Sequence, residues 1–146
     1  MKKSYTLVVI LLSILLGCSE DEVNTTPDSN ISNTSSNTIM HVGVNREYLV
    51  YIPSSYNQTY SAPLMLNFHG FGGNSSDFMN YADMRTLAES DTFILVYPQG
   101  SLSNGFSHWN PCPIGGDNKS TADDFGFIEA MVQEIASQYN VDLDRI

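Results

Sequence analysis

A short apolar segment that ends in a glycine-rich turn constrains the fold of this chain more than any other feature. Residues 63–68 begin with a proline, continue as an apolar run too short for a helix, and lead into the letters HGFGG at 69–73. This pattern predicts a buried strand followed by a sharp turn. Glycines permit positive φ and leave space beside the backbone, so N–H groups of the turn can face a polarised carbonyl oxygen. The turn is a candidate oxyanion hole for acyl transfer, and an ordinary turn between a strand and a helix is the alternative.

The N-terminal residues have the pattern of an export signal over residues 1–17. A basic start precedes an apolar run at 7–16, which is too short to cross a bilayer as a mature helix. The letters LLGC at 15–18 resemble the lipobox of bacterial lipoproteins. That resemblance implies cleavage before Cys18, lipidation of Cys18, and anchoring to the outer membrane or cell surface of a bacterium.

The residues after Cys18 predict a tether and then one folded domain. An acidic cluster and a tract of Ser, Thr and Asn fill residues 18–38 with few apolar side chains, which is typical of disorder. We expect the folded domain over residues 39–146. If Cys18 carries lipid, Cys112 is left either free or paired with a cysteine outside this chain.

The charge balance argues against one class of partner. Six Lys and Arg stand against sixteen Asp and Glu, for a formal net charge of -10. Nucleic acid is an unexpected partner because binding it requires a basic face. The sequence contains no recognisable metal or cofactor motif, and the glycine spacing at 69–73 fits neither phosphate-binding pattern.

Strand and helix signals alternate through the first part of the domain. Residues 39–44 and 46–52 predict an antiparallel hairpin at a sheet edge, turning around Asn45. Cap residues at 74–77 predict a helix to about residue 90, broken near Ala82. Residues 92–97 predict a second buried strand, parallel to the strand at 63–68 that precedes the glycine-rich turn. The expected core side chains of the helix recur at helical spacing: Phe78, Tyr81, Met84, Leu87 and Ala88.

The second part of the domain predicts a long loop and a long helix. Residues 99–120 are rich in Gly, Ser, Asn and Pro, and Trp109 is either a wall for a bound ligand or a residue that packs the loop onto the domain. Thr121 is the expected cap of the following helix. Asp123 and Asp124 are expected to be cap residues rather than catalytic acids or metal ligands. The predicted apolar stripe is Ile128, Met131, Ile135 and Tyr139, and a further strand is expected from Arg145.

Six motifs in this order resemble a known family. They are RxYxVYxP at 46–53, PLxLxFHGxGG at 63–73, YPQG at 97–100, WN at 109–110, DDxGF at 123–127 and YxVDxDRI at 139–146. The set resembles the secreted esterase family of polyhydroxybutyrate depolymerases, feruloyl esterases and acetyl xylan esterases. The resemblance implies an α/β fold, here the N-terminal half of an α/β-hydrolase sheet with an edge hairpin, parallel strands and crossover helices.

The same resemblance implies a site and a reaction. The backbone N–H of Phe71, with Gly72 beside it, would face the carbonyl of an ester, either a polyester or a plant cell-wall ester, without a cofactor. The family's G-x-S-x-G nucleophile motif has no counterpart in these residues, and Ser103 is excluded because its glycine lies one position too far away. The chain as given is therefore expected to lack the serine, acid and histidine of a serine esterase. The alternative is an inactive lipoprotein or binding module derived from such an esterase.

Overall fold

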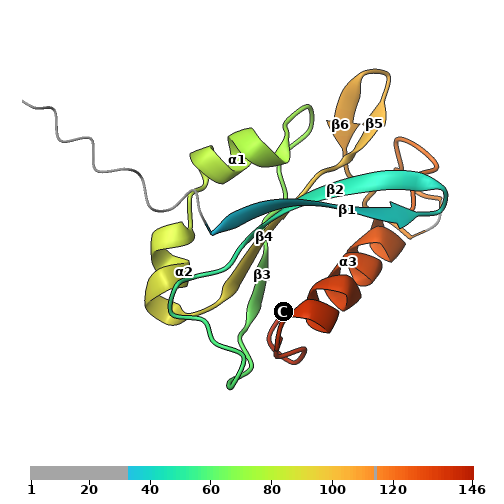
Figure 1. Cartoon of the computed structure of the whole chain (residues 1–146). Helices are drawn as coiled ribbons and strands as arrows, with labels where there is room; N and C mark the ends of the chain where they lie inside the picture. The colour runs from blue at the N-terminus through green and yellow to red at the C-terminus, as the bar shows by residue number, and fades with distance from the viewer. Residues whose placement is uncertain (1–32, 114) are drawn as a thin grey trace, which may run out of the picture.

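The computed structural model describes residues 33–113 and 115–146. Their main sheet has four strands in the order β1-β2-β4-β3 (Figure 1). The first two pairings are antiparallel and the β3–β4 pairing is parallel, which confirms the predicted edge hairpin and parallel pair. The predicted signal, Cys18 and residues 18–32 of the tether lie outside the described residues. The strands are β1 (Thr34–His41), β2 (Val44–Tyr51), β3 (Leu64–Leu66) and β4 (Ile94–Pro98).

The edge hairpin starts earlier and turns earlier than expected. β1 begins at Thr34, so residues 34–38, assigned to the tether, pair with β2. Their polar side chains tolerate this position because β1 is an edge strand whose outer face is exposed. The turn lies at Val42 and Gly43, with φ values of 48° and 75°, while Asn45 pairs with Met40 inside the ladder. Two positive φ values match the twist of a two-residue hairpin turn, and glycine at the second position favours it.

Two short helices connect β3 to β4, as the predicted break near Ala82 requires. They are α1 (Ser75–Tyr81) and α2 (Arg85–Asp91). The Asn74 side chain caps α1 by accepting a hydrogen bond from the Asp77 N–H at 2.8 Å. This is the expected use of a polar residue before a helix.

The predicted core positions of these helices were only partly right. Ala88 is fully buried, but Tyr81 and Leu87 are exposed, and Met79 is buried instead. The interruption of the helix rotates α2 relative to α1, so one continuous helical stripe no longer describes which side chains face the sheet.

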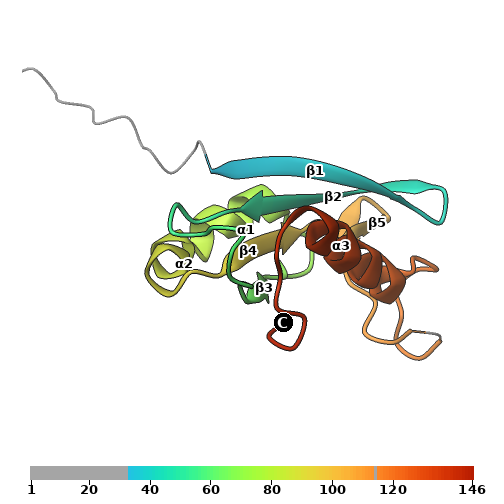
Figure 2. The same ribbon diagram turned by 60° about the horizontal axis from the view of Figure 1, so that its bottom comes forward.

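The sheet separates two apolar cores, with α3 (Asp124–Gln138) on one face and α1 and α2 on the other (Figures 1 and 2). Every residue of β4 is buried, because this strand has neighbours on both edges and helices on both faces. The α3-side core includes Val50, Ile94, Val96, Phe127, Met131 and Ile135. The opposite core includes Tyr51, Met79, Ala88, Leu95 and Tyr97.

The segment 99–120 is not a plain loop. It contains a two-stranded sheet of β5 (Ser101–Ser103) and β6 (Phe106–His108), which projects beyond the end of the main sheet in Figure 1. Asn104 and Gly105 form its turn with φ values of 52° and 82°. These strands were not predicted from the sequence. The Asn-Gly pair between two short strands is a strong sequence signal for such a hairpin and could have identified them.

The start of α3 corrects one predicted cap and confirms another. Asp123, not Thr121, is the cap, and its side chain accepts a hydrogen bond from the Gly126 N–H at 2.9 Å. Met131 and Ile135 are buried as predicted, and Phe127 and Val132 are buried beside them.

The residues after α3 lie along the free edge of β3. The Asp142 N–H donates to the Ala62 oxygen at 2.8 Å, and the Leu64 N–H donates to the Arg145 oxygen at 3.0 Å. The first of these bonds and the one from the Ala62 N–H to the Asn140 oxygen, at 2.9 Å, form an isolated parallel bridge between Ala62 and Val141. The further strand from Arg145 stays a prediction. None of the helices in the described part of the chain is both long and apolar enough to cross a membrane.

Candidate active site

The glycine-rich turn follows directly from the pairing of β3 with β4. The Asn67 N–H donates to the Val96 oxygen at 2.8 Å and prolongs the parallel ladder by one residue. The turn then closes on itself, because the Gly73 N–H donates to the Gly70 oxygen at 3.0 Å. Gly72 has a φ of 75°, a conformation that a residue with a Cβ adopts only with strain. The predicted strand and sharp turn are confirmed.

The two predicted oxyanion donors differ in their availability. The Gly72 N–H donates to the Ser107 oxygen at 2.8 Å, so it is occupied by the protein itself. Among the residues that the structure describes, none accepts a hydrogen bond from the Phe71 N–H. Of the two amides, that of Phe71 is therefore the one that no described residue engages, and residue Phe71 is 71% exposed. Its role as an oxyanion donor stays a prediction.

His69 fixes the turn to the end of β4. Its ring is buried, and its Nε2 accepts a hydrogen bond from the Gly100 N–H at 3.0 Å. Its Nδ1 lies 2.7 Å from the Gly70 oxygen, so the ring carries its proton on Nδ1 and donates there. A Cβ at Gly100 would lie 2.5 Å from the His108 oxygen, which explains the glycine at this close approach. His69 is thus a structural histidine of the turn.

Trp109 braces the same turn. Its Nε1–H donates to the His69 oxygen at 3.1 Å, and its ring meets the Phe68 ring edge to face at 5.1 Å between centroids. These contacts match the packing alternative for Trp109, since they hold the segment after β6 against the turn. A contact between Trp109 and substrate stays a prediction.

An exposed aromatic pair stands beside the Phe71 amide. The Phe71 and Phe106 rings stack with centroids 5.6 Å apart and planes 21° apart. Phe106 belongs to β6, so the hairpin missed by sequence reasoning reaches the candidate oxyanion turn. Both side chains stay exposed, which leaves an apolar surface next to the candidate donor.

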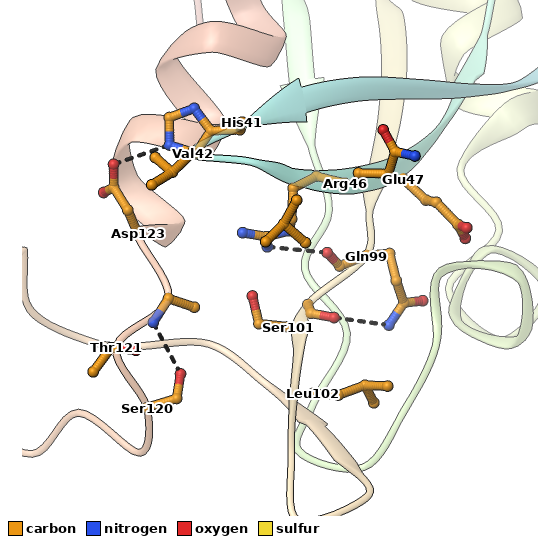
Figure 3. Close-up of a pocket in the computed structure, with 14 residues that line it drawn as sticks. His41, Val42, Arg46, Glu47, Gln99, Ser101, Leu102, Ser120, Thr121 and Asp123 are labelled. Atoms are coloured by element: carbon orange, nitrogen blue, oxygen red, sulfur yellow. Dashed lines mark hydrogen bonds and ion pairs between the residues drawn. The ribbon is translucent and has the colours of Figure 1, made fainter.

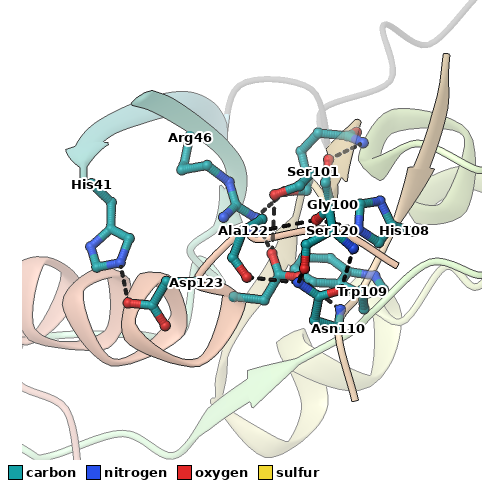
Figure 4. Close-up of polar contacts among 12 residues, drawn as sticks. His41, Arg46, Gly100, Ser101, His108, Trp109, Asn110, Ser120, Ala122 and Asp123 are labelled. Carbon is teal, nitrogen blue, oxygen red and sulfur yellow. Dashed lines mark hydrogen bonds and ion pairs between the residues drawn. The ribbon is translucent and has the colours of Figure 1, made fainter. Parts of the chain in front are cut away.

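Asp124 is part of a buried ion pair rather than a catalytic acid. Its Oδ1 lies 2.7 Å from Nη2 of Arg46, and the two residues are 4% and 6% exposed. Its Oδ2 accepts from the Asn110 N–H at 2.8 Å, and its Oδ1 accepts from the Ser101 hydroxyl at 3.2 Å. The Arg46 guanidinium also lies over the Phe127 ring, 4.0 Å from its centroid. This network ties β2, the segment 100–110 and the start of α3 together (Figure 4).

Asp123 joins the hairpin tip to α3. Its Oδ2 lies 2.9 Å from Nε2 of His41, at the rim of a depression of ≈ 620 Å³ (Figure 3). The pKa of the Asp123 carboxyl is lowered, first by the hydrogen bond from the Gly126 N–H and then by the one that the His41 ring donates. A cap and a buried ion pair explain the two aspartates, so they form no catalytic acid pair.

The described residues contain no serine, histidine and acid arranged as a triad. Ser103 ends β5 and leads into a hairpin turn, not into a helix, and its hydroxyl donates to the Lys119 oxygen at 3.3 Å. His108 contacts the Ser120 hydroxyl at 2.8 Å, but its Nδ1 meets no acid. No group of residues in the described ranges could hold a metal ion, and Cys112 forms no disulfide with another described residue.

Solved structures share the arrangement of strands and helices described above. A thermostable esterase aligns with a TM-score of 0.56 at 15% identity, over 77% of this chain and 32% of its own. An acetyl xylan esterase from Aspergillus awamori aligns with a TM-score of 0.56 at 19% identity, over 74% of this chain and 39% of its own. At these identities the likeness defines the fold alone. The described residues form part of an α/β-hydrolase fold, as predicted.

Two curated proteins are similar to the chain in sequence. A bifunctional acetylxylan esterase/xylanase of Neocallimastix patriciarum is 30% identical over 104 residues, which are 71% of this chain and 14% of the relative. Feruloyl esterase B of Piromyces equi is 30% identical over 101 residues, or 69% and 18% of the two chains. The chain spans less than a fifth of the length of these curated relatives. No family model matches the chain.

Proposed function

We propose that this chain supplies the oxyanion side of an exported carboxylic-ester hydrolase that works by serine acyl transfer. The observation that carries the proposal is the Phe71 N–H, which no described residue occupies at the end of a turn held by His69 and Trp109. Acetylxylan and feruloyl esterase relatives support an ester as the substrate. The candidate substrates are plant cell-wall esters and polyesters.

In this mechanism a serine attacks the ester carbonyl and a histidine takes its proton. The Phe71 N–H donates to the carbonyl oxygen as negative charge develops there, which stabilises the tetrahedral intermediate. The turn is pre-organised for that task, because its position is fixed before the substrate arrives. The serine, the acid and the histidine have no counterpart in this part of the fold, so the Phe71 amide is the group of the site that these residues contribute.

Fluorophosphonate labelling tests the serine mechanism. The natural polypeptide that carries this sequence is identified in the membrane fraction with an antibody against the domain, and the fraction is treated with a fluorescent fluorophosphonate. Covalent labelling of that polypeptide is expected. An unlabelled polypeptide would contradict serine acyl transfer and favour the inactive or binding-module alternative. Its recovery in the membrane fraction also tests the proposed lipid on Cys18.

Two substitutions at Phe71 test the oxyanion assignment. Phe71→Pro removes the N–H, and we expect kcat to fall by about 10²–10³. Phe71→Ala keeps the N–H and removes only the exposed ring, so its kcat is expected to fall far less. Circular dichroism of both variants checks that the fold is retained. Equal activities of the two variants would argue against Phe71 as the donor.

A further inference from the structure

The β5–β6 hairpin contacts the glycine-rich turn through one residue, Ser107. The Ser107 backbone oxygen accepts the hydrogen bond from the Gly72 N–H at 2.8 Å. The Ser107 hydroxyl donates a hydrogen bond to the oxygen of Gly73. One side chain and its own backbone thus hold two consecutive residues of the turn, directly after Phe71.

Ser107 is placed to act as a rigid support. It is 5% exposed and pairs with Leu102 in the antiparallel ladder of the hairpin. The next residue but one is Trp109, whose indole holds the oxygen of His69 at the other end of the turn. Residues 106–109 therefore hold the turn at both ends, with Trp109 at His69 and Ser107 at Gly72 and Gly73.

A turn with three glycines needs such support. Glycine gives the backbone more conformational freedom than any other residue, so an unsupported turn would sample many orientations of the Phe71 N–H. A donor stabilises an oxyanion only when it is held within about 0.5 Å of its productive position. The Gly72 amide is not available to substrate, because its hydrogen bond to the Ser107 oxygen attaches the turn to the hairpin.

We propose that Ser107 is a positioning residue for the oxyanion turn. It fixes Gly72 and Gly73 and so orients the Phe71 N–H toward the substrate carbonyl without touching the substrate. The proposal rests on the proposed esterase function for its catalytic consequence. Its structural part, the fastening of the turn by the serine hydroxyl, is measurable without any catalysis.

The hairpin offers a matched control for the test. Ser103 lies on the other strand of the same hairpin, and its hydroxyl contacts Lys119 rather than the turn. Ser107→Ala and Ser103→Ala therefore each remove one hydroxyl group, from the two strands of the same hairpin. Ser107→Thr keeps the hydroxyl and provides a conservative rescue. All three are made in the complete natural polypeptide.

Amide hydrogen exchange is the first measurement. In Ser107→Ala we expect the Gly72 amide to exchange at least about tenfold faster than in the unmodified protein, because Gly73 is no longer fastened by the hydroxyl and the turn can move away from the Ser107 oxygen. The amides of β4 keep their protection, which shows that the fold is intact. Ser103→Ala and Ser107→Thr leave Gly72 protection within about twofold. Unchanged protection of Gly72 in Ser107→Ala would overturn the proposal.

Steady-state kinetics on an aryl ester is the second measurement. A small misplacement of a catalytic group costs up to about 10²-fold, so kcat of Ser107→Ala is expected to fall by about 10 to 10²-fold with KM nearly unchanged. A rise in KM alone, or an equal loss in Ser103→Ala, would contradict a positioning role. If the unmodified protein neither hydrolyses the ester nor reacts with fluorophosphonate, the esterase function fails, and exchange at Gly72 still decides whether Ser107 fastens the turn.

Discussion

Single residues with buried charge hold the segments around the site together, and Asp124 is the centre of that arrangement. It accepts hydrogen bonds from Arg46 on β2 and from Ser101 and Asn110 in the segment 100–110. The sequence places Arg46 and Asp124 in separate motifs but contains no signal that they pair, since they are 78 positions apart. Local patterns predict caps well and distant ion pairs poorly, because a pair depends on the tertiary fold.

Loss of the Asp124 charge is expected to be strongly destabilising. Asp124→Asn leaves the buried Arg46 guanidinium without its charged partner, and breaking one side of a buried pair costs about 3–5 kcal/mol. Urea unfolding, followed by the fluorescence of Trp109, measures the free energy of unfolding. Asp117→Asn is the control, because Asp117 is exposed, and its effect should stay within about 0.5 kcal/mol. A small effect of Asp124→Asn would mean that water reaches the Arg46 guanidinium.

We expect the ionisation of Tyr51 to lower the free energy of unfolding in alkali. Burial and the 2.5 Å hydrogen bond from its hydroxyl to Glu89 raise the pKa of Tyr51 from 10.0 to about 12. Between pH 10 and about 12 the unfolded chain releases this proton while the folded protein retains it, so the free energy of unfolding falls as pH rises. Its contribution is fully present below pH 10 and lost by about pH 12.

Urea unfolding from pH 7 to 12 measures this dependence. Tyr51→Phe is expected to be less stable than the unmodified protein at pH 7 by about 1 kcal/mol, from the lost hydrogen bond, and to show a shallower decline above pH 10. Tyr60→Phe is the control, because Tyr60 is exposed. Parallel declines in the two variants would show that Tyr51 does not carry the effect.

Turns and caps at the scale of elements were predicted where the residue type itself imposes the geometry. Asn74 caps α1, and the glycine-rich segment forms a sharp turn. The hairpin turn at Val42 was misplaced because valine rarely adopts a positive φ, so the polar Asn45 was the stronger local signal. The strands β5 and β6 were missed because three-residue strands resemble loop composition, although Asn104-Gly105 marks their turn.

The misplaced turn makes a prediction about stability. Val42 has a φ of 48° and a side chain that is 77% exposed, so it contributes strain and little burial. Val42→Asn gives this turn the Asn-Gly sequence of the β5–β6 hairpin, and we expect it to raise the free energy of unfolding by about 1 kcal/mol. The reverse exchange, Asn104→Val, should lower it by a similar amount. Thermal unfolding of the pair measures both, and destabilisation by Val42→Asn would refute the strain argument.

The whole molecule is organised about β4, whose side chains alternate between two cores. Ile94 faces the core beneath α3 and Leu95 faces the core beneath α1 and α2. The edge hairpin and the parallel β3–β4 pair were predicted from sequence, because continuous apolar runs with helices between them favour a parallel arrangement. The antiparallel pairing of β2 with β4 was not predicted, because it joins strands that are distant in sequence. Of the candidate site, the sequence indicated the turn but not its support by Ser107, because that contact joins Ser107 to Gly72 and Gly73, which are distant from it in sequence.

If one cooperative unit includes both cores, a cavity in either core should lower the same unfolding transition. Ile94→Ala and Leu95→Ala are each expected to cost about 2–5 kcal/mol. Trp109 fluorescence reports the α3-side core, and far-ultraviolet circular dichroism reports all helices. The two signals should shift together in both variants, whereas Leu102→Ala, on an exposed side chain, should shift neither.

If Leu95→Ala lowered the dichroism transition and left the Trp109 transition in place, the core beneath α1 and α2 would unfold independently. The glycine-rich turn, which depends on β3 and β4, would then stay supported by the α3-side core alone.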